Sequence, residues 1–193
     1  MTDIRESVRE AYGTAIERKS GCGGGEGDMT NMMKDNYGSE ATAATPKDIV
    51  AQSFGCGNPI QAALLKEGER VLDLGSGAGV DLILAAKAVT QSGHVYGLDM
   101  TPAMLGRARK NIDRLGLKNI TLLRGYIEDL PLHDGSVDVL ISNCVINLSP
   151  DKDRVFGEAY RVLTPGGRFC VSDVVLMKPV LEKLKSNPAA WSG

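Results

Sequence analysis

The sequence predicts an α/β fold in which a doubly wound, mostly parallel sheet is covered by helices. Short apolar segments rich in branched residues alternate with longer helical segments from residue 70 to about 186. The short segments are apolar on both faces, which is typical of strands buried between two layers of helix. A glycine-rich turn follows the first of them. Regular alternation of strand and helix favours a parallel sheet with crossover helices.

An amphipathic helix is expected at the start of the chain. Apolar side chains recur every three to four residues from Ile4 through Val8 and Tyr12 to Ile16, and the pattern stops at Ser20. Residues 21–38 are rich in Gly, Asp, Asn and Met and show no periodicity, so we expect a mobile loop there. This segment contains Cys22, whose role the sequence leaves open.

Four pairs of a side-chain acceptor followed by proline mark the expected helix starts. The acceptor can cap the first amides of a helix, and proline suits the first helical position. The pairs are Thr45-Pro46, Asn58-Pro59, Thr101-Pro102 and Ser149-Pro150. The expected strands are residues 70–74, 94–98, 120–123, 137–142 and 168–172. The expected crossover helices are residues 79–89, 102–115 and 150–163.

Composition argues against several classes of partner. Lys+Arg 22 against Asp+Glu 24 gives a net charge of −2, so no basic excess is present to neutralise nucleic-acid phosphates. No stretch reaches the roughly 18 apolar residues that a membrane span needs. The chain begins with Met1, Thr2 and Asp3 and lacks the basic and then apolar start of a signal peptide. We expect a cytoplasmic protein with reduced thiols, and the charge does not predict its oligomeric state.

The most informative segment is residues 71–79, VLDLGSGAG, in which a strand carrying an acid runs into a glycine-rich turn. Asp73 can accept hydrogen bonds or face a cation, while glycine lets the backbone approach a ligand closely. Asp99 ends the second strand, twenty residues after Gly79, where a carboxylate can bind ribose hydroxyls. Val80 in the sixth place disfavours the dinucleotide fingerprint. The structural alternative is a simple tight turn, with Asp99 capping the helix at Thr101.

This pattern resembles the class I S-adenosylmethionine-dependent methyltransferases over residues 70–176. The resemblance implies a Rossmann-like fold and S-adenosylmethionine as the cofactor. It implies the methionine part of the cofactor at Asp73, Gly75, Ser76, Gly77 and Gly79, the ribose at Asp99, one face of adenine at Met100, the adenine rim at Ile127 and Glu128, and the reacting sulfonium beside Asn143.

A narrower resemblance is carried by residues 54–59, FGCGNP, and residues 142–152, SNCVINLSPDK. Both are similar to segments of the arsenite methyltransferases. This similarity implies that Cys56 and Cys144 are catalytic and bind trivalent arsenic, as substrate, with thiol donors of the glutathione or thioredoxin type as partners. Thiolates are soft ligands and suit a soft centre. The arsenic lone pair can attack a methyl carbon without a general base, so catalysis would rest on positioning.

Each cysteine also has a structural interpretation, because free cysteine is often a small buried hydrophobe. This interpretation is preferred for Cys170, which lies inside a strand between Phe169 and Val171. Two functional alternatives also stand. One is a methyltransferase of the same fold that acts on a quinone or sterol carbon. The other is a non-catalytic module that binds the cofactor or arsenic.

The arsenite methyltransferases continue with further strands, a C-terminal domain and a third arsenic-binding cysteine after a segment like residues 187–193. This chain stops there, so the resemblance implies a truncated protein that lacks the last strands and leaves the fifth strand as a sheet edge. We expect residues 1–66 to form a helical cap with the mobile loop. Residues 67–193 are expected to form an incomplete cofactor-binding core, and the two parts a single structural unit.

Overall fold

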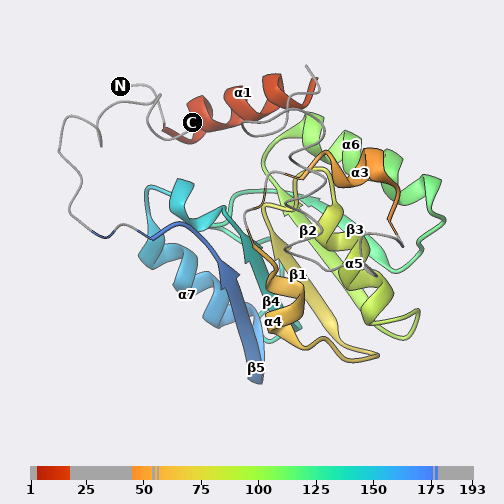
Figure 1. Cartoon of the computed structure of the whole chain (residues 1–193). Helices are drawn as coiled ribbons and strands as arrows, with labels where there is room; N and C mark the ends of the chain where they lie inside the picture. The colour runs from red at the N-terminus through yellow and green to blue at the C-terminus, as the bar shows by residue number, and fades with distance from the viewer. Residues whose placement is uncertain (1–3, 18–44, 54, 56, 176, 178–193) are drawn as a thin grey trace.

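The computed structural model describes residues 4–17, 45–53, 55, 57–175 and 177 (Figure 1). The expected loop over residues 21–38, including Cys22, lies outside the described residues. The described strands form one fully parallel sheet with the order β3-β2-β1-β4-β5. Their bounds are β1 Arg70–Leu74, β2 His94–Asp99, β3 Ile120–Arg124, β4 Val137–Asn143 and β5 Leu163–Ser172. The prediction of a doubly wound parallel α/β fold is confirmed.

The central strand β1 pairs with β2 on one side and β4 on the other. Val71 is in register with Val95 of β2 and with Val139 of β4. The strand order reverses between β1 and β4, since β2 and β3 extend the sheet in one direction and β4 and β5 in the other. In open α/β sheets, ligands bind at the carboxyl ends of the strands beside such a reversal.

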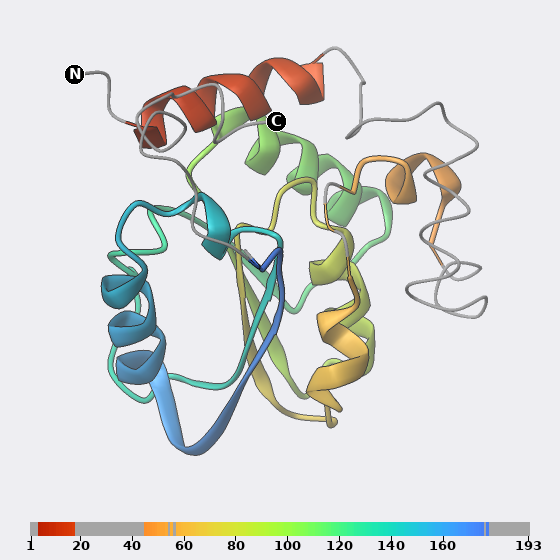
Figure 2. The ribbon, with the colours of Figure 1, turned by 60° about the vertical axis from the view of Figure 1, so that its left-hand side comes forward.

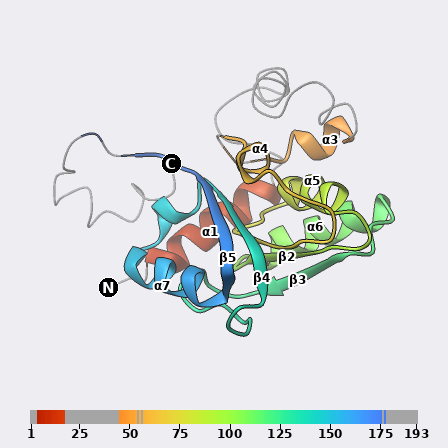
Figure 3. The same cartoon turned by 90° about the horizontal axis from the view of Figure 1, so that it is seen from below.

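Helices cover both faces of the sheet, as Figures 1 and 3 show. The helices are α3 Lys47–Val50, α4 Pro59–Ala63, α5 Val80–Ala88, α6 Pro102–Arg114, the 3₁₀ helix η1 Ile146–Leu148 and α7 Lys152–Val162. Side chains of α4, α5 and α6 pack with Val71 on one face. Side chains of η1 and α7 pack with Leu72 and Leu74 on the other. Successive strand residues point to opposite faces, so both faces of β1 are buried.

Helix α1 (Ile4–Glu17) lies across the carboxyl edge of the sheet, above α6 (Figure 2). Ile16 of α1 is buried against Ala78 of the glycine turn and Met104 of α6, and Tyr12 packs beside them. The expected helix at the start of the chain is therefore confirmed, and it lies next to the turn that follows β1.

The capping residues differ in part from the prediction. Asn58 caps α4 as expected, since its Oδ1 accepts from the Gln61 amide at 2.9 Å. The prediction for Ser149 is wrong, because α7 begins at Lys152 and Asp151 caps it. Ser149 instead donates to the Glu128 carboxylate at 2.5 Å.

The two threonines do not cap with their side chains either. Helix α3 begins after Pro46, and neither Thr45 nor Thr101 supplies a side-chain cap. At the start of α6, Asp99 Oδ1 accepts from the Thr101 amide at 2.8 Å. An acidic side chain two residues upstream thus binds the amide of the N-cap residue itself, while the Thr101 side chain caps none of the first amides of α6.

None of the helices in the described residues combines the length and the apolar character that a bilayer crossing requires. Strands β3 and β5 are the outer strands of the described sheet. Val171 on β5 is 43% exposed.

Candidate functional site

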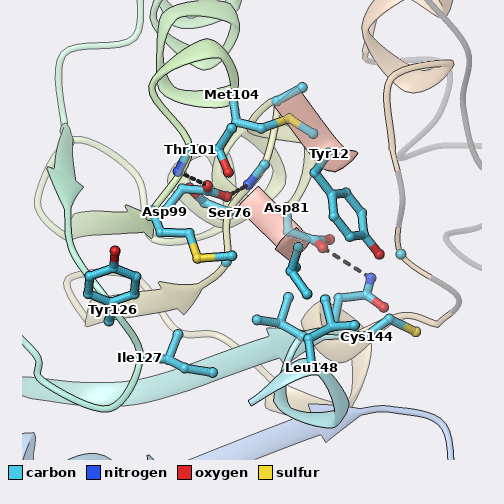
Figure 4. Close-up of a pocket in the computed structure, with 18 of the residues that line it drawn as sticks. Tyr12, Ser76, Asp81, Asp99, Thr101, Met104, Tyr126, Ile127, Cys144 and Leu148 are labelled. Carbon is cyan, nitrogen blue, oxygen red and sulfur yellow. Dashed lines mark hydrogen bonds between the residues drawn. The ribbon is translucent and has the colours of Figure 1, made fainter. Parts of the chain in front are cut away.

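An open cavity lies at the carboxyl edge of the sheet, between the strand ends and α1 (Figure 4). It spans about 1000 Å³ when the solvent at its mouth is counted. The predicted site residues that line it are Gly75, Ser76, Gly77, Asp99, Met100, Ile127, Glu128, Asn143 and Cys144. Asp73 and Gly79 are described but do not line the cavity, and Cys56 lies outside the described residues.

The glycine turn needs its glycines for two different reasons. Gly75, Gly77 and Gly79 all have positive φ, a conformation that side chains disfavour. A Cβ on Gly75 would collide with Val145, so this position also requires the smallest residue. A Cβ on Gly77 would meet nothing within 4 Å. Gly77 therefore presents its backbone directly to the cavity, whereas Gly79 starts α5 and packs against Ala108.

Asp99 uses both carboxylate oxygens to fix the backbone around it. Oδ2 accepts from the Gly77 amide at 2.9 Å, and Oδ1 accepts from the Thr101 amide at 2.8 Å. The hydrogen bond to the Thr101 amide that the capping alternative expects is thus present in the structure, but Asp99 also lines the cavity. Burial raises the pKa of Asp99, while the hydrogen bonds from the Thr101 and Gly77 amides and from the Thr101 side chain act in the opposite direction.

Asp73 is a buried carboxylate with an unsatisfied oxygen. The residue is 2% exposed, and Oδ2 has no hydrogen-bond partner in the structure. Burial raises its pKa well above the ordinary value, and the nearby carboxylates Asp81 and Asp99 raise it further. A buried acceptor without a donor favours a nearby cation or hydrogen-bond donor. Asp73 thus leaves a buried acceptor oxygen at the end of the strand that leads into the glycine turn.

The far end of the cavity is formed by the segment after β3. Glu128 is buried and accepts the hydrogen bond from Ser149, so its carboxylate is held at the cavity wall. Tyr126 is 39% exposed, and the guanidinium of Arg5 from α1 lies 5.1 Å from its ring centroid. This cation–π contact joins α1 to the segment that carries Ile127 and Glu128.

Asn143 ends β4, and its side chain makes three hydrogen bonds to other described residues. Its Oδ1 accepts from the Gly57 amide at 3.2 Å, and its Nδ2 donates to the Gly57 carbonyl at 3.0 Å. Nδ2 also donates to Asp81 Oδ2 at 3.1 Å, the dashed contact to Asp81 in Figure 4. Asn143 therefore joins the first turn of α5 to the backbone beside Cys56.

Cys144 lies at the cavity wall with an unusual backbone. Its φ is 56°, in the left-handed region that a non-glycine residue seldom adopts, and its amide donates to the Ser172 carbonyl at 2.8 Å. Cys144 is disulfide-bonded. The expectation of a reduced thiol at Cys144 is corrected here, because its sulfur is oxidised.

Cys170 behaves as the structural interpretation expects. It is free, half-buried and packed against the core on the α4–α6 face, and burial raises the pKa of its thiol. Within the described residues, no group of three or more His, Cys, Asp or Glu side chains could hold a metal ion.

Among the cavity residues that sequence reasoning missed are Arg5, Tyr12, Asp81 and Tyr126. Asp81 could have been found, because an acid in the first turn after a glycine-rich turn faces the same edge as the strand ends. Arg5 and Tyr12 carried no such signal. They reach the cavity only because α1 folds back over residues far along the chain.

Comparisons with known proteins bear on this arrangement. A family described as "Methyltransferase domain" matches residues 65–193. An arsenite methyltransferase of Halobacterium salinarum is 42% identical over 99% of this chain and 52% of its own length. One from Aquipseudomonas alcaligenes is 46% identical over 97% of this chain and 56% of its own length.

A solved structure shows the same fold. The crystal structure of an arsenic (III) S-adenosylmethionine methyltransferase from Chlamydomonas reinhardtii superposes with a TM-score of 0.70 and 48% sequence identity, covering 78% of this chain and 52% of that one. The chain described here thus spans about half the length of the curated relatives that it matches.

Proposed function

Because this chain belongs to the methyltransferase domain family, we propose that it forms the methyl-donor site of an enzyme that methylates trivalent arsenic. The donor is S-adenosylmethionine and the substrate is arsenic bound by the thiolates of Cys56 and Cys144. The proposal rests on one observation above all. Cys144 and Asn143 line the same cavity as the glycine turn and Asp99. A sulfur ligand for arsenic and the residues proposed to bind the nucleoside therefore face the same cavity.

The residues fit the cofactor. The orphaned Oδ2 of buried Asp73 and the open backbone face of Gly77 are what a cationic, hydrogen-bonding ligand needs. When bound, S-adenosylmethionine supplies an electrophilic methyl group on a sulfonium. We assign its methionine part to Asp73 and to Gly75, Ser76, Gly77 and Gly79. We assign the ribose to Asp99, the adenine to Met100, Ile127 and Glu128, and the region beside the methyl group to Asn143.

No general base is required of the protein. A trivalent arsenic atom carries a lone pair, so a methyl group can be accepted without removal of a proton. The described residues agree with this, since His94 opens β2 and lies outside the cavity lining. The task of the chain is then to hold arsenic and methyl donor in line, which can supply much of the rate.

Thiol donors are the partners that the site requires. The disulfide-bonded Cys144 can bind arsenic only after reduction to the thiolate, since the thiolate is the metal ligand. Two equivalents of a small thiol, or one dithiol of the thioredoxin type, would reduce the bond and become disulfide in turn. We place the protein in the cytoplasm, where such donors are abundant. We treat residues 1–66 and 67–193 as cap and core of one unit.

The test is calorimetric titration of the reduced chain with S-adenosylmethionine and then with arsenite, using a phosphine reductant because a dithiol would itself bind arsenite. We expect both to bind, and Cys144→Ser to lose arsenite binding while it keeps cofactor binding. Single-turnover release of S-adenosylhomocysteine in a full-length relative with and without both cysteines then tests turnover.

Each other result has a definite meaning. Cofactor binding without arsenite binding would favour the methyltransferase that acts on a quinone or sterol carbon, which should be indifferent to Cys56→Ser and Cys144→Ser. Binding of both without any release of S-adenosylhomocysteine in the full-length relative would favour a non-catalytic sensor or carrier.

A further inference from the structure

We propose that Asn143 and Asp81 are positioning residues that fix Gly55 and Gly57, the residues on either side of Cys56 in the sequence, against the end of β4 that carries Cys144. This inference deepens the proposed function and rests on it for the identity of the ligand. Asn143 directly precedes Cys144, and Gly55 and Gly57 are the two sequence neighbours of Cys56. We call Asn143, Asp81, Gly55 and Gly57 the Asn143 clamp.

The Gly57 side of the clamp is a paired backbone contact. The side-chain Oδ1 of Asn143 accepts from the Gly57 N–H, and its Nδ2 donates to the Gly57 carbonyl. The side chain thus imitates a neighbouring strand and satisfies both backbone groups of one residue. Asn143 is 8% exposed, so water competes little for these bonds and they hold the segment more strongly than exposed ones would.

The Gly55 side of the clamp is a steric contact. A Cβ added to Gly55 would overlap the Asn143 side-chain amide, so the Gly55 backbone lies directly against that amide. A Cβ added to Gly57 would likewise overlap Ser172 Oγ. Ser172 also accepts the hydrogen bond from the Cys144 amide. Both glycines are therefore needed for close approach to the ends of β4 and β5.

Asp81 determines which way the Asn143 amide points. An ionised carboxylate only accepts hydrogen bonds, so the group that faces it must be the NH₂ of the amide. Oδ1 of Asn143 is then directed at the Gly57 N–H. If the amide were flipped, its oxygen would face the Asp81 carboxylate and its NH₂ would face the Gly57 N–H. Asp81 thus connects the first turn of α5 to Gly57 through the side chain of Asn143.

These hydrogen bonds are made to the protein, so Asn143 would border the methyl group of the cofactor by contact and would not donate a hydrogen bond to it. Both hydrogens of Nδ2 are used, by Gly57 and Asp81, and one lone pair of Oδ1 is used by the Gly57 amide. Its loss should therefore affect the thiol site more than the cofactor site.

The experiment compares Asn143→Ala with the parent chain in a phosphine reductant by three measurements. These are hydrogen exchange of the peptide around Gly57, calorimetric titration with arsenite, and titration with S-adenosylhomocysteine. We expect exchange at Gly57 and the arsenite Kd both to rise at least about tenfold, the loss expected from buried hydrogen bonds. The S-adenosylhomocysteine Kd should stay within about threefold of the parent value. Asp81→Asn, which permits the flipped amide, should show the same pattern more weakly.

The matched control is Asn119→Ala. Asn119 is equally buried, and its Nδ2 donates to the Ala86 and Thr90 carbonyls outside the cavity lining. Its loss removes comparable hydrogen bonds and should leave both affinities unchanged. If Asn143→Ala does not fold, the same three measurements are made on the milder variant Asp81→Asn.

Two results would overturn the inference: unchanged Gly57 exchange in Asn143→Ala and Asp81→Asn, or equal losses of arsenite and S-adenosylhomocysteine affinity. A parent chain that fails to bind arsenite would instead refute the proposed function. In that case, the exchange measurement still decides whether the clamp holds the segment.

Discussion

At the scale of single residues, Asp73 is kept in a position that costs stability. Its carboxylate is buried with one oxygen unsatisfied, near Asp81 and Asp99. Its pKa is raised in the folded state above the value of 3.8 for an ordinary aspartate. The folded protein therefore binds more protons than the unfolded chain between these two pKa values. The contribution of Asp73 to the free energy of unfolding is therefore largest below pH 3.8, and it falls as the pH rises through the raised pKa.

We predict that Asp73→Asn stabilises the protein at neutral pH while it weakens cofactor binding. The gain should be about 1–3 kcal/mol, the usual cost of an unsatisfied buried polar group. It should shrink toward pH 4, where Asp73 is neutral in the parent chain as well. Urea unfolding at several pH values checks this.

Asp138 supplies the contrasting control. The hydrogen bond from Arg70 lowers the pKa of Asp138, so Asp138→Asn should destabilise the protein at pH 7 and do so less at low pH. If Asp73→Asn lost stability at pH 7 like Asp138→Asn, the account of Asp73 would be wrong.

The glycine turn leads to a second prediction, for Gly77→Ala. The substitution strains a residue at φ +53 and places a methyl group in the cavity. We expect a loss of about 1 kcal/mol in stability from the strain and at least about tenfold in S-adenosylmethionine affinity. Gly135→Ala is the matched control, since Gly135 has φ +57, open surroundings and no place in the cavity lining. Equal cofactor affinity in the two variants would contradict a ligand-facing role for Gly77.

At the scale of elements, α4 is held at both ends. Asn58 caps its first turn beside Gly57, and Arg168 of β5 donates to the Ala63 and Leu64 carbonyls at its end. Arg168 also makes a two-pronged ion pair with Glu69, with both distances 2.7 Å. Helix α4 follows Gly57 and Asn58 directly in the sequence. Because α4 is held at both ends, Gly57 can move little.

We therefore predict that Arg168→Lys destabilises the protein by about 1–3 kcal/mol, because lysine cannot reproduce the planar fork of donors. Hydrogen exchange should rise in α4 in particular. Arg114→Lys is the control, since the ion pair of Arg114 with Asp48 is largely exposed and contributes little. Equal thermal unfolding of the two variants would show that Arg168 does not anchor α4.

The element boundaries show where the sequence was informative and where it was not. Four strands were predicted to within one residue, because each is apolar on both faces and flanked by turn residues, as at residues 70–74. The fifth begins at Leu163 and not at residue 168, since its first half contains Pro165 and two glycines that carry no strand pattern. Helix starts were predicted less well, since several polar side chains compete for the same amides. Asp151 lies nearer the first turn of α7 than Ser149, and the Ser149 hydroxyl binds Glu128, a partner distant in sequence.

At the scale of the whole molecule, the part of the cavity formed by the glycine turn and Asp99 could be predicted from the sequence. The turn directly follows β1 and Asp99 ends β2, so each is recognisable within one short segment. The rest of the cavity depends on tertiary structure. Arg5 and Tyr12 reach it through α1, and the contacts from Asn143 to Gly57 and Asp81 join three segments. The expected roles of Cys22 and Cys56 lie outside the described residues.

A cavity assembled from so many segments should couple ligand binding to global stability. We predict that S-adenosylhomocysteine at one hundred times its Kd stabilises the protein by about 2.7 kcal/mol, which is about 5–10 °C in Tm for a domain of this size. Asp99→Ala should abolish the shift, because it removes a cavity-lining acceptor and frees the Gly77 amide. A shift that survived in Asp99→Ala would exclude this acid from the binding site.

The central place of β1 has a consequence for synthesis on the ribosome. Val71 pairs with Val139, and 139 − 71 = 68 residues must be translated between them, which takes about 3–14 s at 5–20 residues per second. During this interval one edge of β1 can pair with β2, while the other edge has no strand to join. A nascent chain stalled before β4 should therefore be bound by chaperones and cut by proteases. Force-sensitive stalling should detect the folding step only once β4 has left the exit tunnel.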